Sequence, residues 1–223
     1  PKQTIIELSP GSGYWTEILA PYAKATGGTY VATSTDLNNP NISEGAKAAG
    51  ASFEKRYADT AKYGTVNVVG FGPVSGPLGA PGSADMVITA RNIHNWAPNA
   101  AFPDKVLKDA HAVLKPGGIL AVEEHRADPR PDVPGYSNGY MTEAAVIAAV
   151  EKAGFKLAAR SQVNANPKDT KDHPFGVWTL PPSRWTVAGG RGTDANFDRA
   201  KYDAIGESDR MTLKFTKPKQ AAS

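Results

Sequence analysis

The chain of 223 residues is long enough to bury the core of one α/β domain. Hydrophobic residues make up 40% of it and charged residues 21%, and no apolar run reaches the length of a membrane-spanning helix. The net charge of +3 is small and scattered, so neither a nucleic-acid partner nor a membrane partner is expected. The absence of cysteine excludes disulfides, thiolate metal sites and a cysteine nucleophile.

The first segment predicts a nucleotide-binding crossover of strand, glycine turn and helix. An apolar run over Thr4–Leu8 predicts a strand that carries an acidic residue, Glu7, near its end. Gly11 and Gly13 predict a tight turn, and Thr16 stands where a dinucleotide fingerprint needs a further glycine. The apolar residues at helical spacing that follow are Trp15, Ile18, Leu19 and Tyr22.

Residues Glu7 to Gly13 resemble motif I of the Rossmann-like (class I) S-adenosylmethionine-dependent methyltransferases, with Ser9 in place of the first glycine of the motif. The run Leu114-Lys115-Pro116-Gly117-Gly118-Ile119-Leu120 is similar to a helix–turn–strand junction that recurs in the same family. Phrases over 14–22 and 91–96 resemble a bacterial group of predicted methyltransferases of unassigned substrate. The resemblance implies S-adenosylmethionine as the cofactor.

The order of the remaining elements fits that family. The resemblance implies an α/β fold with a Rossmann-like, doubly wound sheet of seven strands, mostly parallel with an antiparallel last strand. We expect helices over 43–62 with a break at Gly50, 102–114 and 141–153, and further strands over 29–33, 67–71, 85–91, 119–124, from 155, and over 209–217.

We expect residues 1–223 to form a single methyltransferase-like domain, with long loops or a lid over 127–140 and 164–192, which are rich in turn-forming residues. Members of the family normally carry helices before the first strand, so the resemblance implies that an N-terminal segment is missing. Members of the bacterial group often carry an export signal. The protein is therefore expected to be periplasmic or exported if a signal peptide was removed, and cytoplasmic otherwise.

Six residues are predicted to bind the cofactor. Asp36 follows the second predicted strand, about twenty residues after the glycine turn, where this fold normally accepts both ribose hydroxyls. The glycines of the turn let a ligand lie against bare backbone. The predicted cofactor-binding residues are Glu7, Ser9, Gly11, Gly13, Asp36 and Asn92.

Polar and aromatic residues follow the strands expected over 85–91 and 119–124, where ligands bind in open α/β sheets. His94 or His125, with Glu124 as an orienting partner, is the predicted base, since histidine moves protons readily near neutral pH. The predicted substrate-binding residues are Arg91, Trp96, Arg126, Tyr136, Tyr140 and His173. No metal site is predicted, because the histidines lack close ligand spacing.

Two functions follow from these observations. The first is methyl transfer from S-adenosylmethionine to a small-molecule acceptor by in-line displacement, which needs alignment and a base only if the acceptor carries a proton. The alternative is a cofactor-independent acid–base enzyme, a lyase or isomerase, on the same scaffold. An exported protein would lack cytosolic S-adenosylmethionine, and its arginines could hold an anionic substrate instead.

Overall fold

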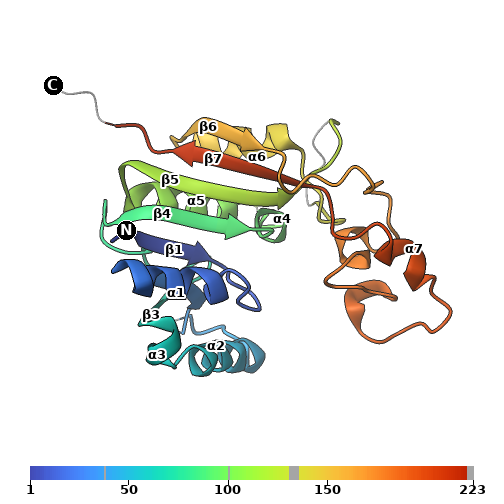
Figure 1. Cartoon of the computed structure of the whole chain (residues 1–223), viewed down its shortest axis with the longest axis horizontal. Coiled ribbons are helices and arrows are strands. Elements are labelled where there is room, and N and C mark those ends of the chain that lie inside the picture. Colours follow the sequence, from blue (N-terminus) through green and yellow to red (C-terminus); the bar gives the residue numbers. More distant parts are fainter. Residues whose placement is uncertain (38, 100, 131–135, 220–223) are drawn as a thin grey trace.

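The computed structural model describes residues 1–37, 39–99, 101–130 and 136–219. Its strands are β1 (Thr4–Leu8), β2 (Thr29–Thr35), β3 (Val66–Phe71), β4 (Ala84–Ala90), β5 (Leu114–His125), β6 (Lys156–Ser161) and β7 (Arg210–Thr216). They form one seven-stranded sheet in the order β3-β2-β1-β4-β5-β7-β6, with β7 antiparallel to both of its neighbours (Figure 1). The predicted fold class is confirmed.

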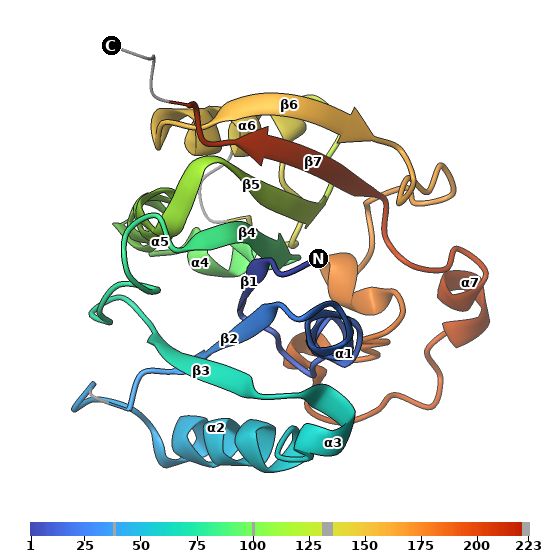
Figure 2. The same cartoon turned by 60° about the vertical axis from the view of Figure 1, so that its left-hand side comes forward.

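Helices cover both faces of the sheet. They are α1 (Thr16–Thr26), α2 (Glu44–Arg56), α3 (Thr60–Tyr63), α4 (Ile93–Trp96), α5 (Ala101–Val113), α6 (Glu143–Lys152) and α7 (Arg199–Asp203). Figure 2 shows α1 and α5 on opposite sides of the sheet. The arrangement is doubly wound, as right-handed crossovers between parallel strands require when the strand order reverses beside β1. Among the described residues, no helix combines the length and the apolar character that a membrane span requires.

The hydrophobic core lies between the central strands and the helices α5 and α6. β1 is paired on both sides, with Ile6 opposite Val31 of β2 and Val87 of β4, and is therefore almost continuously apolar. Each buried aliphatic side chain contributes about 2 kcal/mol to stability. Core residues include Ile6, Val87, Val106, Leu120, Val146 and Phe215.

The predicted helix over 43–62 is two helices, and the expected break at Gly50 is wrong. Gly50 lies inside α2, where a Cβ would sit 3.3 Å from the Ser34 hydroxyl, so the glycine permits close packing on β2. The chain breaks later, where Asp59 caps α3 by accepting the backbone N–H of Ala61 at 2.9 Å.

The connection between β6 and β7 is unusually long, and we call residues 162–209 the cap. It passes over the carboxyl ends of the parallel strands and contains α7 together with the short 3₁₀ helix Gly176–Thr179 (Figure 1). Trp178 and Trp185 stack within it, with ring centroids 5.3 Å apart and planes 18° apart. The cap therefore encloses the edge of the sheet at which this fold binds ligands.

Candidate functional site

A cavity of about 190 Å³ lies at the carboxyl edge of the sheet, and we call it the main cavity. It is lined by the turn after β1, by residues that follow β4, by His125 at the end of β5, and by the cap around Trp178. A second cavity of about 320 Å³, the side cavity, lies beside the end of β2. The two cavities share Ser9, Pro10 and Gly11, so the turn separates them.

The turn after β1 depends on left-handed backbone conformations. Ser9, Gly11 and Gly13 have φ values of +51°, +57° and +88°. A Cβ at Gly13 would lie 1.8 Å from the Tyr57 hydroxyl oxygen, so only glycine fits there. A Cβ at Gly11 would meet nothing within 4 Å, and Gly11 lines both cavities. Ser9 adopts a conformation that glycine favours, and its N–H donates to the Thr33 hydroxyl at 2.7 Å.

Glu7 and Asn92 support this turn. Glu7 is buried and accepts hydrogen bonds from the hydroxyls of Tyr30 and Thr16, and burial raises the pKa of its carboxyl group. The Asn92 amide donates to the carbonyl oxygens of Leu8 and Ser9, at 3.2 Å each. Both residues line the main cavity: Glu7 joins β1 to β2 and α1, and Asn92 joins the ends of β1 and β4. Their contact with a cofactor stays a prediction.

Asp36 follows β2 as predicted, but its side chain lies away from both cavities. It is buried, and a Cβ on Gly70 would lie 3.0 Å from its Oδ1. Asp36 is not among the residues that line either cavity, although Thr33, Ser34 and Thr35 just before it line the side cavity. Asp36 therefore packs against β3 beside the side cavity, and its contact with a ribose stays a prediction.

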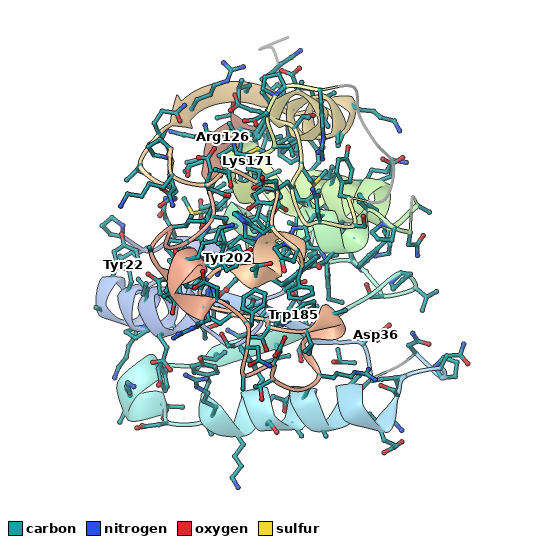
Figure 3. All side chains as sticks on the ribbon, turned by 90° about the vertical axis from the view of Figure 1, so that its right-hand side faces the viewer. Tyr22, Asp36, Arg126, Lys171, Trp185 and Tyr202 are labelled. Atoms are coloured by element: carbon teal, nitrogen blue, oxygen red, sulfur yellow. The ribbon has the colours of Figure 1, made fainter. Side chains whose placement is uncertain are left out.

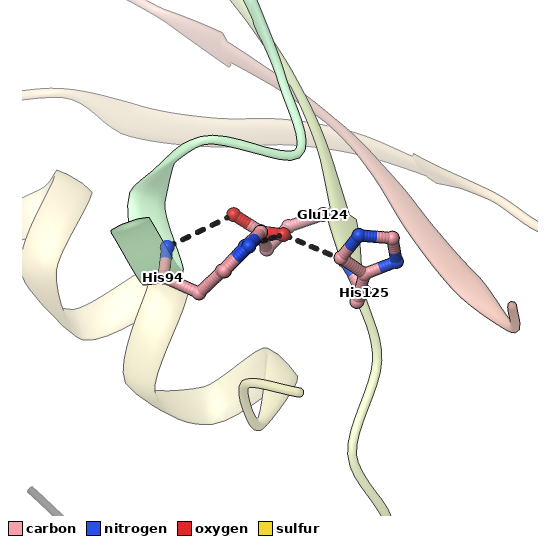
Figure 4. A group of neighbouring side chains, drawn as sticks. All are labelled: His94, Glu124 and His125. Carbon is pink, nitrogen blue, oxygen red and sulfur yellow. Dashed lines mark hydrogen bonds and ion pairs between the residues drawn. The ribbon is translucent and has the colours of Figure 1, made fainter. Parts of the chain in front are cut away.

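His94 and Glu124 form a buried pair. Nδ1 of His94 lies 2.8 Å from Oε1 of Glu124, and the backbone N–H groups of His94 and His125 also donate to this carboxylate, at 3.2 and 2.8 Å (Figure 4). When the imidazole is neutral, this contact with an acceptor oxygen places its proton on Nδ1. Nε2 is then the nitrogen that can accept a proton, and His94 lines the main cavity.

His125 lies beside this pair, with its ring centroid 5.1 Å from that of His94. Its Nδ1 lies 2.5 Å from the Ser208 hydroxyl oxygen. Burial, followed by electrostatic repulsion from the neighbouring His94, Arg210 and Arg91, holds the pKa of His125 well below its ordinary value. His125 is therefore a neutral imidazole in the wall of the main cavity.

His94, Glu124 and His125 also bring three possible metal ligands within 4.8 Å of one another. Two features make this cluster a poor cation site. Glu124 already accepts three N–H groups, and Arg91 and Arg210 place positive charge near His125. The arrangement suits proton transfer better than metal binding.

Three predicted substrate-binding residues are engaged in other contacts. Trp96 is in the hydrophobic core, with its ring centroid 5.7 Å from that of Phe71. Tyr140 and His173 are buried and bind one carboxylate, because the Tyr140 hydroxyl lies 2.8 Å from Oδ2 of Asp169 and His173 Nε2 lies 2.7 Å from its Oδ1. None of these three lines the main cavity, and their role as substrate ligands is not supported by this geometry.

Arg126 and Tyr136 also lie outside the lining of the main cavity. Arg126 pairs with Asp209 at 2.7 Å, and Lys171 approaches the same carboxylate at 3.3 Å (Figure 3). Tyr136 is partly buried against the hydrophobic core. Part of the loop predicted over 127–140, residues 131–135, lies outside the described residues. Of the predicted substrate-binding residues, Arg91 is the one that lines the main cavity.

Sequence reasoning missed two aromatic residues of the site. Trp178 lines the main cavity, with its ring centroid 5.8 Å from that of His94. Trp15, just before α1, lines the cavity, whereas Ile18 and Tyr22, which follow it at helical spacing, are 47% and 46% exposed. Figure 3 shows Tyr22 at the surface. No local pattern marks Trp178, because the fold of the cap brings it to the site.

Solved structures share this fold. The [4+2]-cyclase SpnF matches with a TM-score of 0.60 and 14% identity, over 98% of this chain and 76% of the cyclase. A SAM-dependent methyltransferase from Aquifex aeolicus matches with a TM-score of 0.57 and 13% identity, over 96% and 82%. The Burkholderia thailandensis 1,6-didemethyltoxoflavin-N1-methyltransferase, with bound 1,6-didemethyltoxoflavin and S-adenosylhomocysteine, matches with a TM-score of 0.53 and 14% identity, over 97% and 72%.

At these identities the likeness shows the fold alone, which S-adenosylmethionine-dependent methyltransferases and a [4+2]-cyclase share with this chain. No protein-family profile matches the sequence, and no curated protein matches it. The expected kinship with a bacterial group of predicted methyltransferases stays a prediction.

Proposed function

We propose that the protein is an enzyme that transfers the methyl group of S-adenosylmethionine to a small-molecule acceptor by in-line displacement, with His94 as the base. One observation carries this proposal. A single cavity is lined both by the glycine turn after β1 and by His94, whose imidazole is oriented by Glu124. The S-adenosylmethionine-dependent methyltransferases that share the fold support it.

The shape of the turn fits this cofactor. Gly11 faces open space, and the turn borders the main cavity on one side and the side cavity on the other. A ligand with an amino acid at one end and a nucleoside at the other could therefore lie across Ser9 and Gly11, with the nucleoside beside Thr35 and Phe53. When bound, the cofactor supplies an electrophilic methyl group on a sulfonium.

The residues of the chain would position the acceptor and take up its proton. Nε2 of His94 accepts the proton of an attacking hydroxyl or amine, and Glu124 stabilises the imidazolium that forms. Trp178 closes the cavity from the cap side, which keeps water away from the reacting atoms. Methyl transfer then needs little beyond alignment.

The proposal is tested with tritium-labelled S-adenosylmethionine and a panel of small phenols, carboxylic acids and amines. We expect label transfer by the unmodified protein and a loss of about a hundredfold or more in His94→Asn. His111→Asn is the matched control, since His111 lies on α5 outside the main cavity. The proposal fails if no acceptor is labelled and the protein binds neither S-adenosylmethionine nor S-adenosylhomocysteine.

A second candidate is cofactor-independent acid–base catalysis by a lyase or isomerase. It is favoured by Asp36, which lies away from both cavities, and by the pair of His94 and Glu124, which can move a proton without a cofactor. The [4+2]-cyclase with the same fold gives it a structural precedent. An absence of adenosyl-ligand binding would favour this candidate over methyl transfer.

A further inference from the structure

Two N–H donors at the main cavity have no hydrogen-bond partner. Trp15 Nε1 and Arg91 Nε are closed to bulk water and unpartnered among the described residues, and both residues line the main cavity. The other buried side-chain atoms of this kind belong to Arg199 and Arg210, which do not line it. Because buried donors are almost always paired, two such groups at one cavity indicate a ligand that accepts hydrogen bonds.

The backbone conformation fixes Arg91 directly after the end of β4. Its φ is +59°, a rare conformation for an arginine, and its N–H donates to the Glu123 carbonyl oxygen at 2.7 Å. The side chain has no ion pair with any described Asp or Glu. By contrast, Arg126 pairs with Asp209 at 2.7 Å and Arg210 with Glu123 at 3.0 Å. Arg91 is thus an arginine of the main cavity whose charge is paired with no described carboxylate.

None of the other titratable groups that line the main cavity forms an ion pair with Arg91. They are Glu7, Tyr14, His94 and His125, and the Glu124 carboxylate contacts His94 from outside the lining. The oxygens of Glu7 are bound by the hydroxyls of Tyr30 and Thr16, and burial raises its pKa. His125 is neutral, for the reasons given above. Arg91 therefore brings an unpaired guanidinium to the cavity, and a planar guanidinium matches a carboxylate well.

We propose that Trp15 and Arg91 form a carboxylate-binding pair in the main cavity. The carboxylate has two possible sources, the amino-acid end of the cofactor or the acceptor itself. The first source rests on the proposed function, because it requires an adenosyl ligand. The second is independent of the cofactor and would make the acceptor a small carboxylic acid.

The experiment compares ligands that differ in one carboxylate. Calorimetry measures the affinity of S-adenosylhomocysteine and of its decarboxylated analogue, and ¹⁹F NMR measures the binding of 4-fluorobenzoate and of 4-fluorobenzamide. Each ligand is titrated into the unmodified protein, Arg91→Met and Trp15→Phe. The control variants are Arg191→Met and Trp185→Phe, since Arg191 is exposed and Trp185 lies outside the lining. Trp15→Phe should fold normally, because the N–H that it removes has no partner.

We expect the unmodified protein to prefer the carboxylate by about ten- to a hundredfold and both site variants to lose most of that preference. If the site variants lose the preference between the two adenosyl ligands, the carboxylate belongs to the cofactor. If they lose the preference between the two fluorinated ligands, it belongs to the acceptor. The proposal is overturned if neither preference depends on Arg91, or if Trp15→Phe keeps the preference whole. If no adenosyl ligand binds, the proposal of methyl transfer fails. The two fluorinated ligands alone then test whether Trp15 and Arg91 bind a carboxylate.

Discussion

Nδ1 of His94 lies 2.8 Å from Oε1 of Glu124, and this contact joins the start of α4 to the end of β5. The same carboxylate accepts the backbone N–H groups of His94 and His125. Glu124 therefore fixes both the position of the α4 turn and the orientation of the imidazole. A base formed in this way is held by buried contacts on rigid elements, as a proton-transfer group requires.

Glu124→Gln should disrupt this arrangement while keeping its shape. A glutamine amide presents an N–H₂ group toward one of the three donors, so we expect a loss of about 1–3 kcal/mol in the free energy of unfolding. We also expect a fall of about a hundredfold in kcat for methyl transfer, with little change in KM. Urea unfolding measures the stability, and the label-transfer assay measures kcat. ¹⁵N NMR of the imidazole reports its tautomer, which we expect to have the proton of His94 on Nδ1 in the unmodified protein. An unaltered tautomer and rate would contradict this role for Glu124.

Gly13→Ala should destabilise the protein strongly. The new Cβ would lie 1.8 Å from the Tyr57 hydroxyl oxygen, and the φ of +88° is strained for alanine. We expect a loss of about 2 kcal/mol or more in the free energy of unfolding. Gly82→Ala is the control, because Gly82 has a φ of +67° and open space around its Cβ position. Equal losses in the two variants, measured in urea, would show that contact with Tyr57 does not matter.

The stability of the protein should depend on the protonation of His125. Its pKa is lowered by burial and by nearby positive charge, whereas the unfolded imidazole titrates at about 6.5. Below that pH the unfolded state binds a proton that the folded state does not. The free energy of unfolding should therefore fall as pH drops below about 6.5, by up to about 1.4 kcal/mol per pH unit from this group, and stay level above it.

His125→Asn removes this contribution and should flatten the pH dependence measured in urea between about pH 5 and pH 8. Some slope should remain, because burial and Lys217 also lower the pKa of His111. An unchanged slope in His125→Asn would contradict the buried, neutral state of His125.

Asp169→Asn should loosen the cap. The Asp169 carboxylate accepts hydrogen bonds from the Tyr140 hydroxyl and from the backbone N–H of Asp209 at 2.7 Å, and pairs with His173. An asparagine cannot accept all of these, so we expect faster hydrogen exchange across 162–209 and a loss of about 3 kcal/mol in stability. Asp172→Asn is the control, since Asp172 bonds the exposed Thr170 hydroxyl. Equal exchange in both variants would rule out Asp169 as the anchor of the cap.

Most of the fold could be predicted from the sequence, because its signals are local. The apolar run Thr4–Leu8 predicts the strand that these residues form. In the same way, the glycines predict the turn that contains them, and the apolar periodicity of α5 predicts that helix. The ends of the helices and strands are less well marked by local sequence signals. β5 begins at Leu114, paired with Ala84, whereas a turn was expected over 115–118. Gly50 was expected to break α2, but the contact with β2 that it permits is invisible in the sequence.

The site could be predicted only where it depends on strand ends. Parallel strands end at one edge, so the meeting of His94, Glu124 and His125 follows from their places after β4 and in β5. The cap follows no such rule. Its buried contacts occupy Tyr140 and His173 and bring Trp178 over the cavity, and these depend on tertiary packing between distant segments.

Binding of S-adenosylhomocysteine is the most direct test of the central claim, that the turn after β1 holds an adenosyl cofactor. Calorimetric titration should give micromolar binding to the unmodified protein and to Gly82→Ala, and affinity about tenfold or more weaker in Gly11→Ala. Gly11 and Gly82 have similar backbone conformations and open space around their Cβ positions, but of the two only Gly11 lines the cavities. Failure of the folded, unmodified protein to bind, or equal binding by the two variants, would contradict the account.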